Sequence, residues 1–302
     1  MRFRARNSLA AGLLAALAMG TCPVHAAALP AGVTVTRDIA YGIDQRQRFD
    51  VYTPRGAAGA PVTPVTPVIF MVHGGAWRMG DKAMAGVVDN KVAHWAAQGA
   101  IVVSANYRLL PEAGVATQVA DVAAALAAAQ EKAAQWGGDR RKFILMGHSS
   151  GAHLISLLAS APVPVGTAPW LGAIVLDSAA FDVDLLMRQP HPRLYDRAFG
   201  ADPAAWTALS PYAALAGPGA PVLAVCSSRR ADACPQAQRY AAKAAGMGRR
   251  VQVVPQDLSH GEINQFLGLP GPYTDAVDQF ISTLPGLDKR PLPRAAAISV
   301  RP

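Results

Sequence analysis

Gly147-His148-Ser149-Ser150-Gly151 stands between a short apolar run and a segment with helical periodicity. The run before it, residues 142–146, indicates a buried strand, and residues 152–159 carry apolar side chains at helical spacing. A sharp strand-to-helix turn needs glycine on both sides of its central residue, and it exposes that residue at a helix N-terminus above the sheet. The pentapeptide therefore predicts a nucleophilic Ser149 in an α/β fold.

Short apolar runs alternate with alanine-rich helical stretches along most of the chain. We expect strands at residues 33–41, 47–52, 68–72, 101–105, 142–146, 172–177, 221–226 and 250–254, and helices at 83–98, 119–136, 150–160, 235–245 and 273–284. The later strands are continuous apolar runs, as in parallel sheets covered by helices on both faces. The first two alternate, which predicts an antiparallel hairpin at the edge. The sequence thus predicts one α/β domain over residues 27–284 with a mostly parallel eight-stranded sheet.

Three segments depart from this pattern. Residues 1–26 combine a basic start, an apolar stretch too short for a bilayer and small residues up to Ala26, so we expect a cleaved secretory signal. An uncleaved anchor and a lipoprotein linked through Cys22 are the alternatives. Residues 178–212 predict a short cap insertion, and residues 285–302 a disordered tail. We therefore expect an exported protein, periplasmic or secreted, without stable membrane insertion after cleavage.

The positive charge lies mostly at the ends of the chain. Of the net charge of +8, three arginines in the leader and a net three charges in residues 285–302 leave only +2 for the body. The body has no basic stripe with interleaved aromatic residues, so a nucleic-acid partner is not expected.

A serine nucleophile needs a base and an acid that orients the base, in the chain order serine, acid, histidine in this architecture. His260 follows the last predicted strand and is the predicted base. The loop after residues 221–226 contains Asp232, which we predict to be the acid. Asp177, at the end of the preceding strand, and Asp257 are its rivals.

The remaining cysteines flank the predicted acid. Cys226 and Cys234 are the even pair left once the leader is removed, and in an exported chain such a pair predicts a disulfide. Two buried free thiols are the alternative. A disulfide would close the loop of Asp232 and limit its motion.

A second glycine-rich segment, His73-Gly74-Gly75-Ala76-Trp77, follows the strand at residues 68–72. Glycine lets backbone amides point inward without steric cost, so we expect the amides of Gly75, Ala76 and Ser150 to form an oxyanion hole. His73 is expected to brace this loop. Trp77 fits either the core or a pocket wall.

These motifs together resemble the α/β-hydrolase superfamily, and more narrowly the carboxylesterases related to hormone-sensitive lipase and to bacterial feruloyl esterases. The similar segments are HGGAWRMGDK (73–82), NYRLLPE (106–112), WGGD (136–139) and GHSSGAH (147–153). Three departures stand out: Ala76 replaces a glycine, the acid segment lacks the usual Gly-x-x-Asp turn, and SHGEIN (259–264) replaces the common ending. Glu262 and Asn264 in that ending contact substrate or His260, or are local caps, which we favour.

The resemblance implies an α/β-hydrolase fold and a Ser149–His260–Asp232 serine hydrolase acting on small to medium carboxylic esters, with no metal or cofactor. Arg229 and Arg230 would lie near the mouth, either for an acidic substrate or, as we favour, as a solvated pair. An amidase of the arylformamidase type and a catalytically silent binding protein are the alternative functions.

Overall fold

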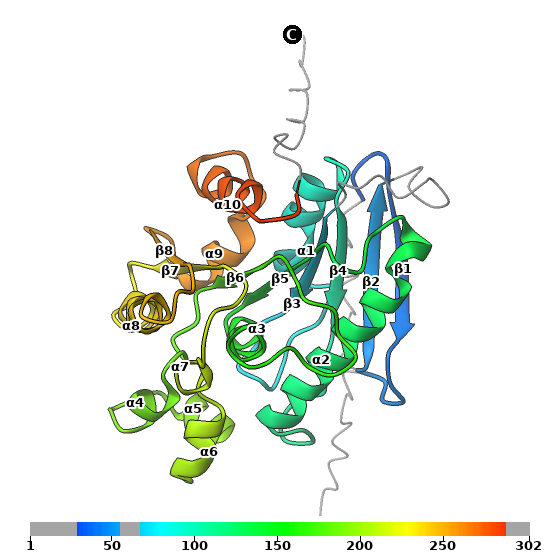
Figure 1. The fold of residues 1–302 in the computed structure, drawn as a ribbon. Helices are drawn as coiled ribbons and strands as arrows, with labels where there is room; N and C mark the ends of the chain where they lie inside the picture. The colour runs from blue at the N-terminus through cyan, green and yellow to red at the C-terminus, as the bar shows by residue number, and fades with distance from the viewer. Residues whose placement is uncertain (1–28, 55–66, 288–302) are drawn as a thin grey trace, which may run out of the picture.

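The computed structural model describes residues 29–54 and 67–287, which form one eight-stranded sheet with helices on both faces (Figure 1). The predicted leader, residues 1–26, and residues 288–302 of the predicted tail lie outside the described residues. The strands are β1 (Val33–Ala40), β2 (Arg48–Pro54), β3 (Val68–Val72), β4 (Ile101–Ala105), β5 (Phe143–His148), β6 (Gly172–Leu176), β7 (Val222–Ser227) and β8 (Val251–Gln256).

The strand order is β1-β2-β4-β3-β5-β6-β7-β8. The pairs β1–β2 and β2–β4 are antiparallel, and all other pairs are parallel. This confirms the predicted fold, including the hairpin at the edge. Because parallel strands end at the same edge of a sheet, the loops after β3, β5, β6, β7 and β8 can meet there.

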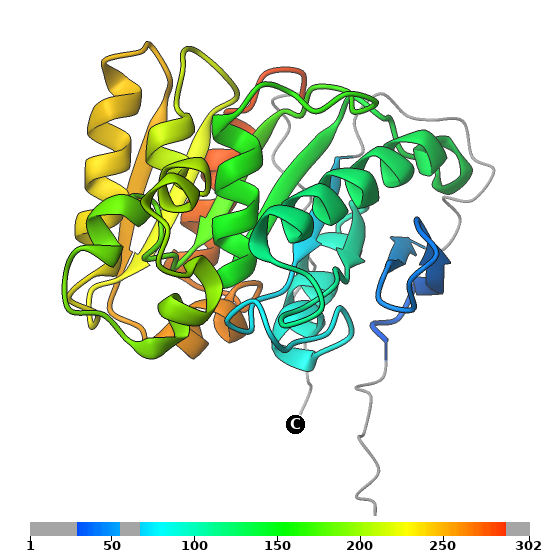
Figure 2. The same cartoon turned by 90° about the horizontal axis from the view of Figure 1, so that it is seen from below.

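The two faces of the sheet are buried by two groups of helices. One face packs under α2 (Val115–Lys132), α3 (Ser150–Ser160) and α8 (Ala233–Ala245), which lie side by side in Figure 2. The other face packs under α1 (Ala85–Lys91), the π-helix η1 (Val92–Ala96), α9 (His260–Phe266) and α10 (Pro272–Ser282). Alternate residues of the central strands, such as Phe70 and Met71, enter opposite clusters, which explains why these strands are apolar throughout.

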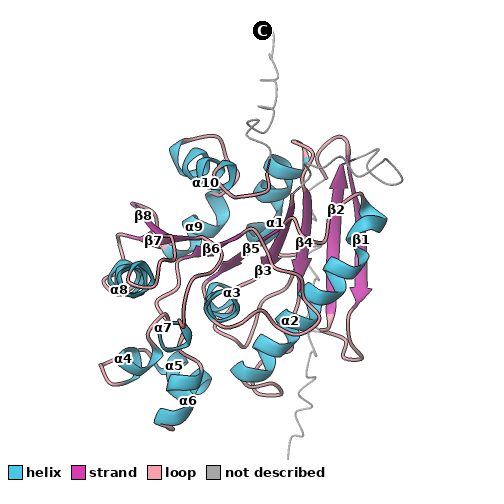
Figure 3. Cartoon of the chain, in the orientation of Figure 1, coloured by secondary structure: helices cyan, strands magenta, loops and turns pink. Residues whose placement is uncertain are grey.

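The helices differ from the sequence prediction at four places. The expected helix at 83–98 is α1 followed by η1, and α2 is extended by a short 3₁₀ turn, η2 (Ala133–Trp136). The α9 helix was not predicted, because it is short and follows a strand directly. Residues 178–212 contain the short helices α4 (Val183–Met187), α5 (Arg193–Phe199), α6 (Pro203–Ala208) and the start of α7 (Pro211–Ala214), which Figure 3 shows gathered together, away from β1 and β2.

No helix among the described residues is both long and apolar enough to cross a membrane.

Candidate active site

The turn between β5 and α3 gives Ser149 an unusual backbone conformation and packs so closely that only glycine fits at Gly147 and Gly151. Ser149 has φ 56° and ψ −119°, and its amide donates to the carbonyl of Leu176 at 2.9 Å. A Cβ on Gly147 would lie 2.5 Å from the Gly151 carbonyl oxygen, and a Cβ on Gly151 would lie 2.4 Å from that of His73. Both distances are shorter than a Cβ contact permits, which explains the two glycines of the pentapeptide.

His260 lies within hydrogen-bond distance of this serine. Its Nε2 is 2.9 Å from Ser149 Oγ. His260 is the first residue of α9, whose start is fixed by a capping box: the Ser259 side chain accepts from the Glu262 amide, and the Glu262 carboxylate accepts from the Ser259 amide. Glu262 is thus a local cap, and the cap holds the backbone of His260 in place.

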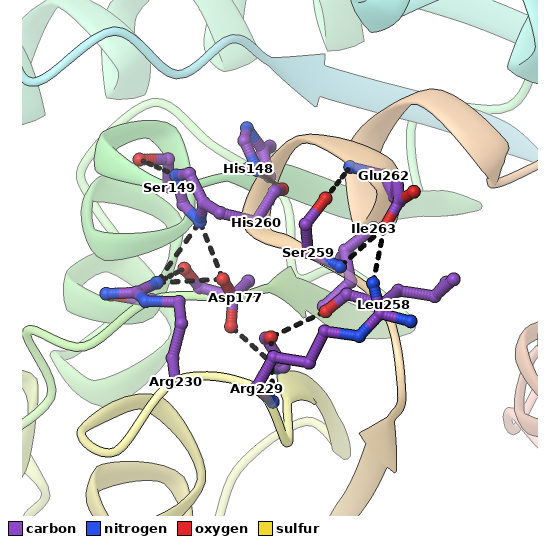
Figure 4. A network of polar contacts seen from close by, with 12 residues as sticks. His148, Ser149, Asp177, Arg229, Arg230, Leu258, Ser259, His260, Glu262 and Ile263 are labelled. Carbon is purple, nitrogen blue, oxygen red and sulfur yellow. Dashed lines mark hydrogen bonds and ion pairs between the residues drawn. The ribbon is translucent and has the colours of Figure 1, made fainter.

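The carboxylate that contacts His260 belongs to Asp177. Its Oδ2 is 2.6 Å from His260 Nδ1, while its Oδ1 accepts from the Ser227 amide at 2.7 Å (Figure 4). Burial of Asp177 would raise the pKa of its carboxyl, but hydrogen bonds from His260, Ser227 and Arg230 outweigh burial and lower the pKa to about 2. Asp177 is therefore a carboxylate over the whole neutral range.

Asp232 does not reach His260, so the sequence-based choice of the orienting acid is corrected to its rival, Asp177. The Asp232 carboxylate instead accepts from Arg230 Nη2 at 3.2 Å, and its side chain is 44% exposed. The physical reason is the strand register: Leu176, the last residue of β6, pairs with His148, so the residue that follows β6 lies beside Ser149. Asp177 directly follows β6, the strand next to the one that precedes Ser149. This position in the sequence is the signal that could have identified Asp177 as the acid. The Asp257 carboxylate pairs with Arg229 instead.

The glycine-rich segment after β3 lines the same pocket as Ser149. Gly75 (φ 132°) and Ala76 (φ 52°) lie there with Ser150, and a Cβ on Gly75 would lie 2.0 Å from the Met79 carbonyl oxygen. Within the described residues, no backbone carbonyl accepts from the amides of Gly75 or Ala76. These amides are therefore free to bind an oxygen atom.

Backbone strain is concentrated around this pocket. Five non-glycine residues in the described part of the chain have a positive φ, and four of them line the pocket, namely Ala76, Trp77, Ser149 and Asp177. Left-handed conformations at such residues cost about 1–3 kcal/mol each, so they persist only where the surroundings impose them. Their clustering marks the pocket as a functional site.

Several contacts hold the glycine-rich segment against the sheet. Trp77 Nε1 donates to His153 Nδ1 of α3 at 3.3 Å, and the Trp77 carbonyl accepts from Gln118 of α2 at 2.8 Å. Lys82, at the end of the segment, pairs with Asp50 of β2 at 2.8 Å. Trp77 is buried, packs against Phe199 of α5 and lines the pocket, so it belongs both to the core and to the pocket wall.

His73 and His148 are buried and neutral. Burial lowers the pKa of His73 to about 4, and its Nδ1 donates to the Gly74 carbonyl at 2.8 Å. Burial, together with the nearby His260, lowers the pKa of His148 to about 3. Its Nε2 donates to the His260 carbonyl at 2.9 Å. This hydrogen bond links the turn of Ser149 to the backbone of His260, and the sequence analysis did not predict it.

The two arginines of the β7–α8 loop have different partners. Arg229 is half exposed and pairs with Asp257 and Glu262. Arg230 points into the site, where its guanidinium contacts Asp177 (Figure 4). Cys226 and Cys234 at the ends of this loop form the disulfide that the sequence predicted.

The pocket around Ser149 has a volume of about 610 Å³. Its wall combines the glycine-rich segment, the start of α1, Leu194 and Tyr195 of α5, and Asn264 of α9. Met79, Met84 and Leu194 are exposed apolar side chains at its edge. In residues 29–54 and 67–287, no group of three or more His, Cys, Asp or Glu side chains could hold a metal ion.

Part of the chain is similar in sequence to known esterases. The family model BD-FAE matches residues 49–163. The chain is 35% identical to a probable isoprenylcysteine alpha-carbonyl methylesterase of Oryza sativa, over 40% of this chain and 27% of that protein. It is 34% identical to Esterase LipC of Mycobacterium tuberculosis, over 40% of this chain and 28% of that protein. The match therefore spans less than a third of these relatives' length.

Two further comparisons concern an amidase and the fold. The chain is 27% identical to the kynurenine formamidase of Danio rerio, over 45% of each chain. The structure superposes on apo Thermogutta terrifontis esterase 2 with a TM-score of 0.66 at 22% identity, covering 87% of this chain and 98% of that one. The described part of the chain therefore has the fold of this esterase, and residues 49–163 are similar to the BD-FAE family.

Proposed function

We propose that this protein is a serine carboxylesterase that hydrolyses small to medium esters through an acyl-enzyme. The observation that carries the proposal is the line of contacts from Ser149 Oγ to His260 Nε2, 2.9 Å, and from His260 Nδ1 to Asp177 Oδ2, 2.6 Å. This is the arrangement of nucleophile, general base and orienting acid that acyl transfer requires.

In the first step, His260 Nε2 takes the proton of Ser149 Oγ as the oxygen attacks the ester carbonyl. The amides of Gly75, Ala76 and Ser150 receive the oxyanion, and the Asp177 carboxylate stabilises the imidazolium. The tetrahedral intermediate then collapses, the C–O bond to the alcohol breaks, and His260 returns the proton to the leaving alkoxide. In the second step His260 takes a proton from a water molecule that attacks the acyl carbon. The bond from this carbon to Ser149 Oγ breaks, His260 returns the proton to Ser149 Oγ, and the carboxylic acid leaves.

The pocket supports neutral esters of modest size. Its 610 Å³ would hold an ester with a short acyl chain or a single ring, and its edge is apolar at Met79, Met84 and Leu194. The two terminal nitrogens of the Arg230 guanidinium, Nη1 and Nη2, already donate to the carboxylates of Asp177 and Asp232. An anionic substrate group would therefore have to displace an internal ion pair.

We also propose that the protein is exported. The basic and apolar leader over residues 1–26 supports this, as does the disulfide, because disulfides persist in oxidising compartments. Mass spectrometry of the protein recovered from culture fractions would find an N-terminus at Ala27 outside the cytosol. Recovery of the full-length chain in the cytosolic fraction would contradict export.

The esterase proposal is tested with p-nitrophenyl butyrate and two neighbouring variants. Ser149→Ala removes the nucleophile and should lower kcat/KM by at least ~10³-fold. Ser150→Ala keeps the backbone amide and should stay within about tenfold of the wild type, since one oxyanion donor contributes 10²–10³-fold and is retained. Equal rates in wild type and Ser149→Ala would overturn the proposal.

A formamidase is the second candidate, supported by the similarity to the zebrafish enzyme. The same triad can attack an N-formyl group, and the difference lies in the leaving arylamine. Comparing kcat/KM for p-nitrophenyl formate and for an N-formyl arylamine of the same size separates the candidates: a preference for the amide would favour the formamidase.

A further inference from the structure

Arg230 occupies a position between two carboxylates beside the base. Its Nη1 donates to Asp177 Oδ2 at 2.7 Å, and its Nη2 donates to Asp232 at 3.2 Å. The same Nη1 is 3.1 Å from His260 Nδ1. His260 Nδ1 and Arg230 Nη1 therefore converge on one oxygen of Asp177, as Figure 4 shows.

We propose that Arg230 is a positioning residue that fixes Asp177 and opposes proton uptake by His260. The inference rests on the proposed function, because it concerns the same triad.

The electrostatic argument starts from the shared oxygen. A carboxylate that already binds a guanidinium offers less negative charge to an imidazolium on its other side. A positive charge 3.1 Å from Nδ1 also repels the positive charge that His260 acquires when it binds a proton. Because the Asp177 side chain is fully buried and that of Arg230 is 25% exposed, solvent screens these interactions only in part. Both effects have the same sign: they favour neutral His260.

The other charged and titratable groups around the base come from several elements: His148 from β5, Tyr195 from α5, Asp232 from the β7–α8 loop, Glu262 from α9 itself, Lys91 from α1 and Tyr273 from α10. His148 and Tyr195 are neutral, because burial lowers the pKa of the first and raises that of the second. Glu262 pairs with Arg229 at the exposed side of the helix. Arg230 is the cation in direct contact with the triad.

Asp232 has a defined part in this arrangement. Its carboxylate binds the outer nitrogen of Arg230 and neutralises part of the guanidinium charge. Removing Arg230 and removing the charge of Asp232 should therefore change the proton affinity of His260 in opposite directions. A purely structural role of the ion pair would not produce opposite signs.

The variant Arg230→Gln is compared with Arg229→Gln, which removes the same charge one residue away from a half-exposed pair. The acidic limb of kcat/KM against pH for p-nitrophenyl butyrate should move up by roughly 1 pH unit in Arg230→Gln, the effect of one charge at this distance. It should not move in Arg229→Gln, and Arg230→Lys should restore most of the wild-type position because the charge returns. Asp232→Asn should move the limb to lower pH by a smaller amount, because Asp232 is more exposed.

A second readout separates this inference from the esterase proposal. The pH titration of the His260 ring protons by NMR, without substrate, should show the same upward and downward shifts. If Arg230→Gln does not fold, the double variant Arg230→Gln, Asp232→Asn, which removes both charges of the pair, carries the test: its limb should still move up, because Arg230 lies closer to His260 than Asp232 does. The inference would be overturned if Arg230→Gln or Asp232→Asn had the same acidic limb and His260 titration as the wild type. It would also be overturned if Arg229→Gln shifted both by as much as Arg230→Gln. Absence of any hydrolysis together with the expected NMR shifts would overturn only the esterase proposal.

Discussion

The amide of Ser149 donates to the carbonyl of Leu176 at 2.9 Å, which joins the turn of Ser149 to the end of β6, directly before Asp177. The serine and the acid are therefore held by adjacent strands, β5 and β6, and only the histidine comes from a more distant part of the sheet. This relation explains why the β6 carboxylate, and not that of the β7 loop, lies at the base.

Replacing the two competing acids gives a direct test of this arrangement. Asp177→Asn should lower kcat of ester hydrolysis by about 10³–10⁴-fold, because the imidazolium loses its stabilising charge. Asp232→Asn should lower it less than about tenfold near neutral pH, since its carboxylate touches only Arg230. Steady-state rates at pH 8 decide the matter. The reverse ranking would restore Asp232 as the orienting acid.

Gly151 should tolerate no side chain. Gly151→Ala would place a Cβ 2.4 Å from the carbonyl oxygens of Val72 and His73, so we expect a loss of roughly 3 kcal/mol or more in the free energy of unfolding. Gly261→Ala is the control: only the Gln265 amide lies near, at 3.9 Å, and alanine favours a helix. Urea unfolding measures both. A Gly151→Ala protein as stable as the wild type would contradict the close packing of α3 on β3.

The disulfide closes a short loop and should add moderate stability. The cross-linked positions are 8 residues apart. Loop-closure entropy for a loop of that size gives roughly 2–3 kcal/mol. Unfolding by urea with and without reductant should differ by that amount, and the variant pair Cys226→Ala, Cys234→Ala should match the reduced protein and ignore reductant. Unchanged midpoints on reduction would show that the loop gains nothing from the bond.

The buried Lys91 should make the free energy of unfolding depend on pH above pH 7. Its ammonium is buried, donates to the carbonyls of Gly86 and Asn264, and burial lowers its pKa to about 7. The unfolded chain, with a pKa near the ordinary 10.5, binds more protons between these values, so stability should rise from pH 7 toward pH 10. Lys91→Met should lose this rise while wild type keeps it. Parallel stability curves for the two proteins would contradict the assignment.

The sequence could predict most of the fold because its signals are local. The residues of β3 and β4 were predicted with the bounds that the structure has, since both are apolar runs between clear turns. Ser149 and His260 were found for a similar reason: each stands directly after a strand in a distinctive segment. The α9 helix was not predicted, because its seven residues show too little periodicity.

The acid could not be settled in the same way. Asp177 and Asp232 both follow strands, and the choice between them depends on the register of β6 against β5, which pairs Leu176 with His148. Spacing along the chain carries no information on this register. The backbone strain at Asp177 and the bond from the Ser227 amide likewise exist only once β6 and β7 are paired.

With Asp177 as the acid, the site is built from two kinds of segment: the ends of central strands and the loop after β7. In the proposed site, Ser149 and Asp177 are held by the interior of the sheet, while Arg230 of the disulfide-closed loop after β7 sets the charge beside the base. The Ser227 amide binds Asp177, so this residue and the two cysteines belong to the fixed part. A different working pH should then follow from exchanging only residues 228–233 in relatives or engineered variants.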